Sequence, residues 1–303
     1  MNNFIVLDNG LKYSGIYQYA YNFSQITKTE YVNIRDKKHY LKSIYFPYPT
    51  KKIPIYSNPI MPQYKKGITI YHDLFFLKYD YRKREIWKNI LDKFIGIEKL
   101  TESFHNYIIA NSNYTLKQIE KLFPKRILGY LYPFIPLPKY ENSFLLPPNK
   151  FYICHISDLN TRKNIPFIQK LFSILPENYY LIRIGLPIPN IKNQISYTNL
   201  NENEKNSLMK KCNLLIEPSI DEGFGIPVIE AMLNKVPVLA NDISVFKEIT
   251  NNTIMLKNLD INEWKEIILS NNFNDTEKAY SYALKYTDST EYIKNAKRLL
   301  IKY

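Results

Sequence analysis

The fold is decided by the stretch Glu217-Pro218-Ser219-Ile220-Asp221-Glu222-Gly223-Phe224-Gly225-Ile226-Pro227-Val228-Ile229-Glu230-Ala231-Met232. The apolar run before it predicts a strand that ends at Glu217, and a helix is predicted from Ile226. Pro227 suits the first helical turn, where its missing N–H is not needed. The glycines between them let the backbone approach a ligand closely. Free N–H groups and the positive dipole end at the helix start then predict an anion site.

Two carboxylates flank this predicted anion site. Glu222 lies in the loop, and Glu230 lies one turn into the helix, where side chains lean back toward the N-terminus. Both can therefore reach one cleft, which suits a ligand with a phosphate and vicinal hydroxyls, a nucleotide sugar. Two glutamates at this spacing are common by chance, and the alternative is a surface turn before an ordinary helix. The inference depends on the whole string.

Short apolar runs alternate with helical patterns on both sides of this stretch. We expect strands at 4–7, 31–34, 68–72, 107–110, 127–132, 151–156, 179–184, 213–217, 236–240 and 254–256. We expect helices at 15–23, 82–104, 114–122, 165–175, 202–210, 226–233 and 245–249, and a helical chain from 261 onward. Such alternation indicates βαβ units and mostly parallel sheets.

The segment from residue 132 to 150 interrupts the alternation with five prolines, and it is predicted to be an extended linker. We therefore expect two doubly wound Rossmann-like α/β domains, residues 1–143 and 144–288, facing a cleft. Residues 289–303 are expected to form a C-terminal helix. One option for this helix is that it crosses back to the first domain. In such sheets ligands bind beyond the carboxyl ends of the strands.

The composition excludes several classes of protein. With 303 residues, 45% hydrophobic and 23% charged, the chain has the balance of a globular protein. It contains no run of the roughly 18–20 apolar residues that a membrane-spanning helix needs, and its N-terminus does not resemble a signal peptide. Two cysteines, Cys154 and Cys212, exclude a disulfide scaffold and favour a reducing, cytoplasmic setting.

The net charge of +13 is uneven. Residues 1–143 carry 22 Lys/Arg against 11 Asp/Glu, whereas residues 144–303 carry 19 against 17. An excess in one half indicates an anionic partner: nucleic acid, anionic lipid or an acidic substrate. The expected helix at 82–104 is basic and amphipathic, which suits either an anionic membrane surface or a solvated face. The alternative explanation of the positive charge is a compositional bias of this chain toward lysine, without a functional role.

The full string at 217–232 resembles the donor-site signature of retaining glycosyltransferases of family 4, which have the GT-B fold. Residues 157–164 resemble the family's loop after the first strand of the C-terminal domain, where a basic pair, here Arg162 and Lys163, binds the donor diphosphate. Many members have Gly-Arg where this chain has Ser157-Asp158. Four other segments also resemble segments of the family and follow the same order along the chain. They are the glycine turn at Gly15, the His-Asp motif at His72, residues 110–115 and residues 236–240.

The resemblance implies a retaining, metal-independent hexosyltransferase that moves a sugar from a nucleoside diphosphate to a hydroxyl acceptor. His72, Glu222 and Lys163 would be catalytic. The donor would be bound by Gly15, Arg162, Lys163, Phe224, Gly225, Ile226 and Glu230, with Glu230 on the ribose hydroxyls and Glu222 on the transferred sugar. His72 alone also suits a structural role.

We expect neither a cofactor nor a metal, since no Asp-x-Asp follows a strand and no Cys/His set has zinc spacing. The expected partners are a nucleotide sugar and a hydroxyl acceptor, with anionic and lipid-linked glycans among the candidates. Peripheral contact with an anionic membrane on its cytoplasmic face is considered. The alternatives are a sugar-nucleotide isomerase or glycoside phosphorylase of the same architecture, and a protein that binds polyanions or nucleic acid. We expect no nucleic acid, because no recognition module is present.

Overall fold

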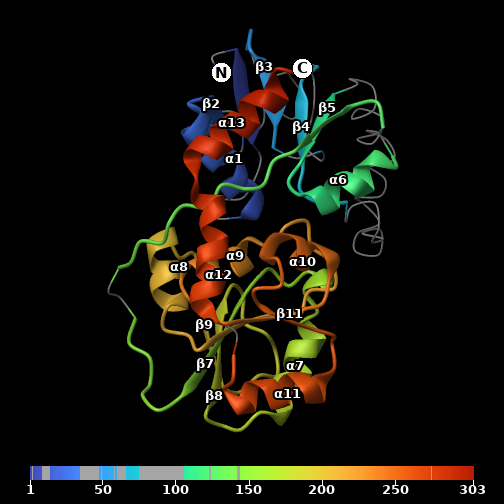
Figure 1. Ribbon diagram of the computed structural model, residues 1–303. Helices are drawn as coiled ribbons and strands as arrows, with labels where there is room; N and C mark the ends of the chain where they lie inside the picture. Colours follow the sequence, from blue (N-terminus) through green and yellow to red (C-terminus); the bar gives the residue numbers. More distant parts are fainter. Residues whose placement is uncertain are drawn as a thin grey trace, which may run out of the picture. The chain divides into compact units, whose positions relative to one another are not determined.

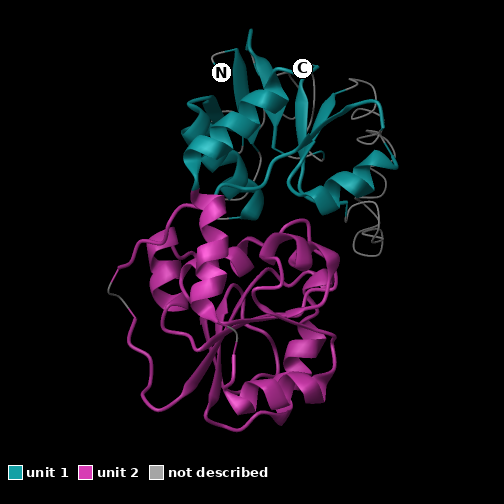
Figure 2. Cartoon of the chain, in the orientation of Figure 1, with its two compact units in different colours: residues 1–134, 288–303 teal, residues 135–287 magenta. Residues whose placement is uncertain are grey.

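The computed structural model describes residues 1, 3–8, 14–34, 48, 50–57, 59, 66–74, 106–122, 124–141, 144–273 and 275–303. The chain divides into two compact units (Figure 2). Unit 1 comprises Met1–Phe134 and Asp288–Tyr303, and unit 2 comprises Ile135–Thr287.

Unit 1 is built on a parallel six-stranded sheet in the order β2-β1-β3-β4-β5-β6 (Figure 1). The strands are β1 (Phe4–Asp8), β2 (Glu30–Asn33), β3 (Ile53–Tyr56), β4 (Ile68–Tyr71), β5 (Tyr107–Ala110) and β6 (Ile127–Tyr130). Nearly continuous apolar runs such as Ile-Thr-Ile-Tyr in β4 form these strands because a parallel sheet is covered on both faces.

The described helices of unit 1 are α1 (Gly15–Thr27), α6 (Asn113–Glu120) and α13 (Ser289–Leu300). Helix α1 begins where the Ser14 side chain accepts a hydrogen bond from the Tyr17 amide, and α6 begins at Ser112 in the same way. Helix α13 lies beside α1 (Figure 1), and its Ala296 and Leu299 join the core formed by strand residues such as Val6. The last helix of the chain thus completes the core of unit 1.

Unit 2 has a second parallel six-stranded sheet, in the order β12-β11-β10-β7-β8-β9. Its strands are β7 (Phe151–Ile156), β8 (Tyr179–Ile184), β9 (Gln194–Tyr197), β10 (Leu214–Glu217), β11 (Val238–Asn241) and β12 (Met255–Lys257). Its helices are η2 (Thr161–Lys163), α7 (Ile165–Ile174), α8 (Glu202–Met209), α9 (Ile226–Leu233), α10 (Ser244–Thr250), α11 (Ile261–Ser270), α12 (Thr276–Ala283) and η3 (Leu284–Thr287). One core packs the fully buried Trp264 of α11 against strand and α7 residues.

The prediction of two Rossmann-like domains is confirmed, but the expected boundary at 143/144 is wrong. The division falls at 134/135, because the residues that follow bind to unit 2. The Ile135 amide donates to the Tyr286 carbonyl (2.9 Å), and the Glu141 amide donates to Ser207 Oγ (2.6 Å). From Ile135 onward, the proline-rich segment is therefore hydrogen-bonded to unit 2 and is not a free linker.

Two strands escaped the sequence prediction. Strand β3 contains Pro54, but pairing with β4 begins only at Ile55, so the missing N–H interrupts no bond on that side. Strand β9 is a half-buried edge strand with no apolar run. The expected helix at 82–104 lies outside the described residues.

The strand orders place a topological switch point in each sheet. In unit 2 the chain runs outward from β7 to β8 and β9, and then returns to β10 on the other side of β7. In unit 1 the corresponding position lies between β1 and β3. The loops beyond such adjacent strands separate and leave a crevice where ligands bind. Within the described part of the chain, no helix is long and apolar enough to cross a membrane.

Candidate functional site

The candidate site of unit 2 is formed by the two loops at its switch point. Residues 157–164 follow β7, and residues 218–225 follow β10. The Ile220 amide donates to the Arg162 carbonyl (2.9 Å), and Asn164 Nδ2 donates to the Pro218 carbonyl (3.3 Å). Asn164 has a φ of 52°, a left-handed conformation that asparagine tolerates well. These bonds hold both loops in one arrangement.

The loops bring together three of the predicted site residues. Arg162 Nη1 lies 2.5 Å and Lys163 Nζ lies 2.6 Å from the same oxygen, Oε1 of Glu222. Lys163 Nζ also lies 3.7 Å from Oε2 of Glu217, the last residue of β10. Lys163, Glu217 and Glu222 are all buried. The two cations expected to bind a diphosphate are thus already paired with a carboxylate.

Burial and charge act in opposite directions on these carboxyl groups. Burial would raise the pKa of Glu222, but Lys163 and Arg162 outweigh it and lower that pKa to about 2. For Glu217, burial dominates and raises the pKa, although Lys163 opposes it. Ser219 Oγ donates to Glu217 Oε1 (2.5 Å). Glu222 is therefore the ionised partner of the two cations near neutral pH.

The start of α9 requires the glycine at 225. Gly225 precedes the helix with a φ of 101°, and a Cβ there would lie 2.7 Å from Cε1 of Phe246. Pro227 occupies the first turn, as the sequence predicted, and Ile226 is half-buried at the first helical position. Since Pro227 has no N–H and the Val228 amide donates to the Gly225 carbonyl (3.0 Å), Ile226 is the residue of the first turn whose amide suits an anion.

Glu230, the second glutamate of the string, pairs with a different cation. Its Oε1 lies 2.6 Å from Nζ of Lys205, which is on α8. Burial raises the pKa of Glu230 to about 7, although Lys205 acts to lower it. Glu230 also lines a pocket of about 220 Å³ together with residues 135–139 and the start of α8. An acidic group that ionises near neutrality beside a pocket can accept hydrogen bonds from hydroxyls.

The Phe224 side chain packs inside unit 2. Its ring is buried and lies edge-on against Tyr286, with ring centroids 5.4 Å apart. The contact of Phe224 with the donor stays a prediction.

Arg183 on β8 is a residue that the sequence interpretation missed. It is fully buried, and its guanidinium donates to the carbonyls of Ser157 (2.5 Å), Ile184 (3.0 Å), His155 (3.3 Å) and Asp158 (3.4 Å). Burial lowers its pKa to about 10, so it stays charged near neutrality. It fixes the exit of β7, where this chain has Ser157-Asp158. A lone arginine in the apolar run Tyr-Tyr-Leu-Ile-Arg-Ile was the available signal.

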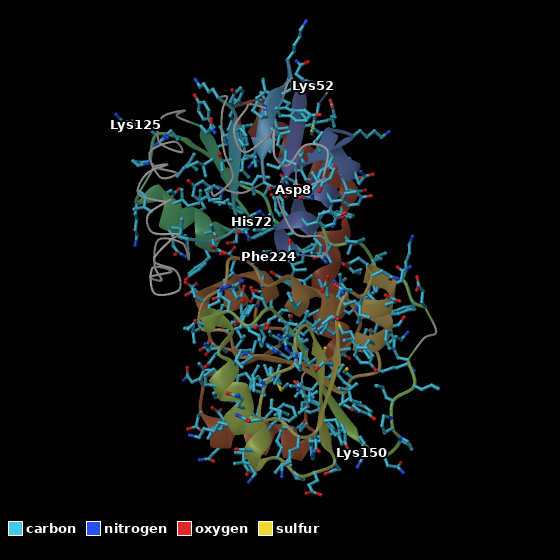
Figure 3. All side chains as sticks on the ribbon, turned by 180° about the vertical axis from the view of Figure 1, so that it is seen from behind. Asp8, Lys52, His72, Lys125, Lys150 and Phe224 are labelled. Carbon is cyan, nitrogen blue, oxygen red and sulfur yellow. The ribbon has the colours of Figure 1, made fainter. Side chains whose placement is uncertain are left out.

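The remaining predicted residues lie in unit 1. Gly15 is exposed at the first position of α1. His72 follows β4, and its Nε2 lies 2.8 Å from the Ser57 carbonyl, while its ring packs edge-on against Tyr19. Figure 3 labels His72 and Asp8, which both lie at carboxyl ends of strands in this unit. Burial lowers the pKa of His72 to about 4, so the ring is neutral at pH 7.

Both cysteines of the chain lie in unit 2. Cys154 and Cys212 are free and buried. Within the described ranges, no three or more His, Cys, Asp or Glu residues are arranged to hold a metal ion.

The comparison with protein families concerns the same part of the chain. Residues 138–270 match the family model described as Glycosyl transferases group 1. The matched segment contains both switch-point loops and the ion pairs of Glu222 and Glu230.

Two bacterial relatives match shorter parts of the chain. The O-antigen chain mannosyltransferase RfbU of Salmonella typhimurium is 46% identical over 67 residues, which make up 22% of this chain and 19% of that protein. The O-antigen biosynthesis glycosyltransferase WclY of Escherichia coli is 25% identical over 119 residues, 36% of this chain and 34% of that protein. The match thus spans well under half the length of either relative.

The whole fold has a solved counterpart. The Anabaena protein HepE, crystallised in complex with UDP-glucose, superposes with a TM-score of 0.74 at 14% identity, covering 99% of both chains. This likeness confirms the prediction of the GT-B fold.

Proposed function

We propose that this protein is a retaining, metal-independent glycosyltransferase of family 4 that moves a hexose from a nucleoside diphosphate to a hydroxyl acceptor. The observation that carries the proposal is the pairing of Arg162 and Lys163 with Glu222 at the switch point of unit 2. The same residues lie within the segment that matches the glycosyltransferase family model.

Each part of the donor has a group suited to it. The diphosphate meets Arg162, Lys163 and the backbone of Gly225 and Ile226 at the start of α9, where charge and the helix dipole favour an anion. The ribose hydroxyls donate to Glu230, and a hydroxyl of the transferred sugar donates to Glu222. When the diphosphate binds, Arg162 and Lys163 are shared between it and Glu222.

The mechanism we propose is front-face substitution. The bond between the sugar C1 and the phosphate oxygen breaks, and the acceptor oxygen forms its bond to C1 on the same face. The acceptor proton passes to the departing phosphate oxygen. Arg162 and Lys163 stabilise the charge that develops on the leaving diphosphate, the term that contributes most when donors are pre-organised.

His72 and Gly15 are the residues of unit 1 to which we assign a role in the reaction. The neutral imidazole of His72 is proposed to contact the transferred sugar, and the exposed backbone at Gly15 is proposed to approach the diphosphate. Glycine at a helix start leaves room for such an approach.

The names of the similar proteins support a proposal for the acceptor and the donor. One is called an O-antigen chain mannosyltransferase, and the solved counterpart was crystallised with UDP-glucose. We therefore propose a hexose donor carried on UDP or GDP, and a glycan hydroxyl, including lipid-linked glycans, as acceptor. An enzyme with such an acceptor would act at the cytoplasmic face of a membrane.

The decisive experiment is a thermal-shift screen of UDP- and GDP-hexoses, followed by an assay for released nucleoside diphosphate. A ligand at 100 times its Kd stabilises the folded state by about 2.7 kcal/mol. Release that depends on added acceptor, with the anomeric configuration kept, supports the proposal. Release without acceptor, or turnover that requires a divalent cation, contradicts it.

Lys163→Ala tests the site assignment in the same assay. We expect weaker binding of nucleoside diphosphate and a smaller salt dependence, because one charged contact is lost. Lys170 on α7 is exposed and gives a matched control as Lys170→Ala. Equal behaviour of both variants would remove Lys163 from the site.

A further inference from the structure

Helix α8 carries a buried lysine that sequence interpretation had not connected with the site. Lys205 Nζ lies 2.6 Å from Oε1 of Glu230 and 2.8 Å from Oε2 of Glu202, and its side chain is 9% exposed. Lysine is rarely buried unless it is paired. Its neighbours Leu208 and Met209 are fully buried, so an apolar side chain would suit this position for packing alone. A lysine here therefore requires another explanation.

The two carboxylate oxygens of Glu230 have different surroundings. Lys205 binds Oε1, and within the described part of the chain no hydrogen bond reaches Oε2. The carboxylate is thus held by one oxygen, with the second available to a ligand. Asn234, at the end of α9, donates to the Glu230 carbonyl (2.8 Å) and to Asn206 Oδ1 (2.9 Å), which links the two helices beside this pair.

We propose that Lys205 is a positioning residue for the nucleotide: it keeps Glu230 ionised and oriented so that the free oxygen receives the ribose hydroxyls. The inference rests on the proposed function, because it assumes that Glu230 binds a ribose. Lys205 itself does not touch the reacting atoms.

The charges around Glu230 agree with this role. Lys205 and Glu202 act on it from α8, and Lys139 lines the same pocket from the proline-rich segment. Helix α12, which packs against α9, directs Glu277 to Lys235. Burial and Glu202 both disfavour the carboxylate form of Glu230, and Lys205 opposes them. Without the lysine, the pKa of Glu230 would rise above 7.

The test compares nucleotides that have or lack the ribose hydroxyls. Calorimetry measures binding of UDP and 2′,3′-dideoxy-UDP, or the guanine pair if GDP is the nucleotide that binds. We expect the parent protein to prefer the hydroxylated nucleotide by about 10-fold or more, from at least one charged hydrogen bond. In Lys205→Met this preference disappears at pH 7, and the pH midpoint of UDP binding moves up by about 1–3 units.

Two variants separate positioning from folding. Lys205→Arg keeps the charge and should restore most of the preference, while Lys211→Met removes an exposed lysine just after α8 and should change nothing. A Lys205→Met variant that loses affinity for both nucleotides equally, or keeps the full preference, overturns the proposal. A parent protein that binds neither UDP nor GDP overturns the proposed function instead.

Discussion

At the scale of single residues, each glutamate of the string at 217–232 has its own cation. Glu222 shares one oxygen between Arg162 and Lys163, and Glu230 binds Lys205. The sequence predicted that Arg162, Lys163 and Glu222 lie in loops at one cleft, but it did not predict that they pair with one another. It gave no indication of the pairing of Glu230 with Lys205, because lysines in a helical pattern ordinarily face solvent and the periodicity of α8 does not reveal an ion pair.

Glu222→Gln should bind nucleoside diphosphate more tightly than the parent and turn over more slowly. The substitution removes the carboxylate that competes with the diphosphate for Arg162 and Lys163, so affinity rises several-fold. Turnover falls because the proposed contact to the sugar hydroxyl loses its charge. Calorimetry with UDP or GDP and the release assay measure the two effects. Weaker nucleotide binding would show that Glu222 supports the cations rather than competing with a ligand.

Glu230→Ala should weaken nucleotide binding while the fold survives. Each lost charged hydrogen bond contributes about 1.5–3 kcal/mol, and alanine is a good helix former. Because burial raises the pKa of Glu230 to about 7, binding by the parent should strengthen as pH rises from 6 to 8.

The same carboxyl group should affect stability in the opposite direction. The folded state raises the pKa of Glu230 above the ordinary 4.5. The contribution of this group to the free energy of unfolding therefore decreases as pH rises from about 4.5 to 7. Denaturant titrations of the parent and Glu230→Ala across this range measure the difference. Nucleotide binding that is flat between pH 6 and 8 would exclude Glu230 from the ribose site.

His72→Ala should lower turnover more than donor affinity, since the donor contacts proposed for unit 2 remain. The change also removes the bond to the Ser57 carbonyl and the packing on Tyr19, at a cost of about 1 kcal/mol or more in stability. Because burial lowers the pKa of His72 to about 4, the parent rate should show no histidine titration between pH 5.5 and 8. Unchanged turnover would leave His72 a structural residue.

At the scale of elements, the turn before α9 depends on one glycine. Gly225→Ala should destabilise unit 2 by about 1–3 kcal/mol, because alanine is strained at a φ of 101° and its Cβ meets the Phe246 ring. Gly15→Ala is the matched control: this exposed position lies in the first turn of α1 and has no positive φ. Chemical denaturation measures both. Equal stability of the two variants would mean that the loop before α9 relaxes freely.

The predicted elements were accurate where apolar runs were bounded by turn residues. The bounds of β5, β7, β8 and α9 were predicted to the residue. Strands β3 and β9 were not predicted. Strand β3 has only four residues, one of them Pro54, and β9 is half-buried without an apolar run, so neither shows a long apolar or alternating pattern. The hydrogen bonds from Arg183 to the loop after β7 could not be predicted either, because they depend on the register of β7 with β8.

At the scale of the whole molecule, the two units differ in charge. Unit 1 carries 25 Lys/Arg against 12 Asp/Glu, whereas unit 2 carries 16 of each. The entire net charge of +13 therefore belongs to unit 1. Since the proposed diphosphate contacts Arg162 and Lys163 lie in neutral unit 2, the donor does not explain this excess. It indicates a second anionic partner for unit 1, for which an anionic membrane surface is our proposal.

Binding to anionic vesicles tests this last proposal. Each Lys or Arg near such a surface contributes about 1 kcal/mol, and the attraction decays within a Debye length of about 10 Å at 0.1 M salt. Co-sedimentation should therefore rise with the fraction of anionic lipid and fall steeply with salt. On unit 1, the exposed residues Lys117, Lys121 and Lys125 lie in or just after α6, as does the half-exposed Leu122, and Figure 3 labels Lys125.

Replacing Lys117, Lys121 and Lys125 by glutamine should weaken vesicle binding by up to about 3 kcal/mol and leave nucleotide binding unchanged. The control replaces three exposed lysines of unit 2, Lys170, Lys192 and Lys278, and changes the net charge equally. If net charge alone drove association, both variants would lose the same affinity. A loss confined to the unit 1 variant would locate the membrane-facing surface on that unit, whereas no binding of the parent at low salt would assign the positive charge to a soluble anionic acceptor.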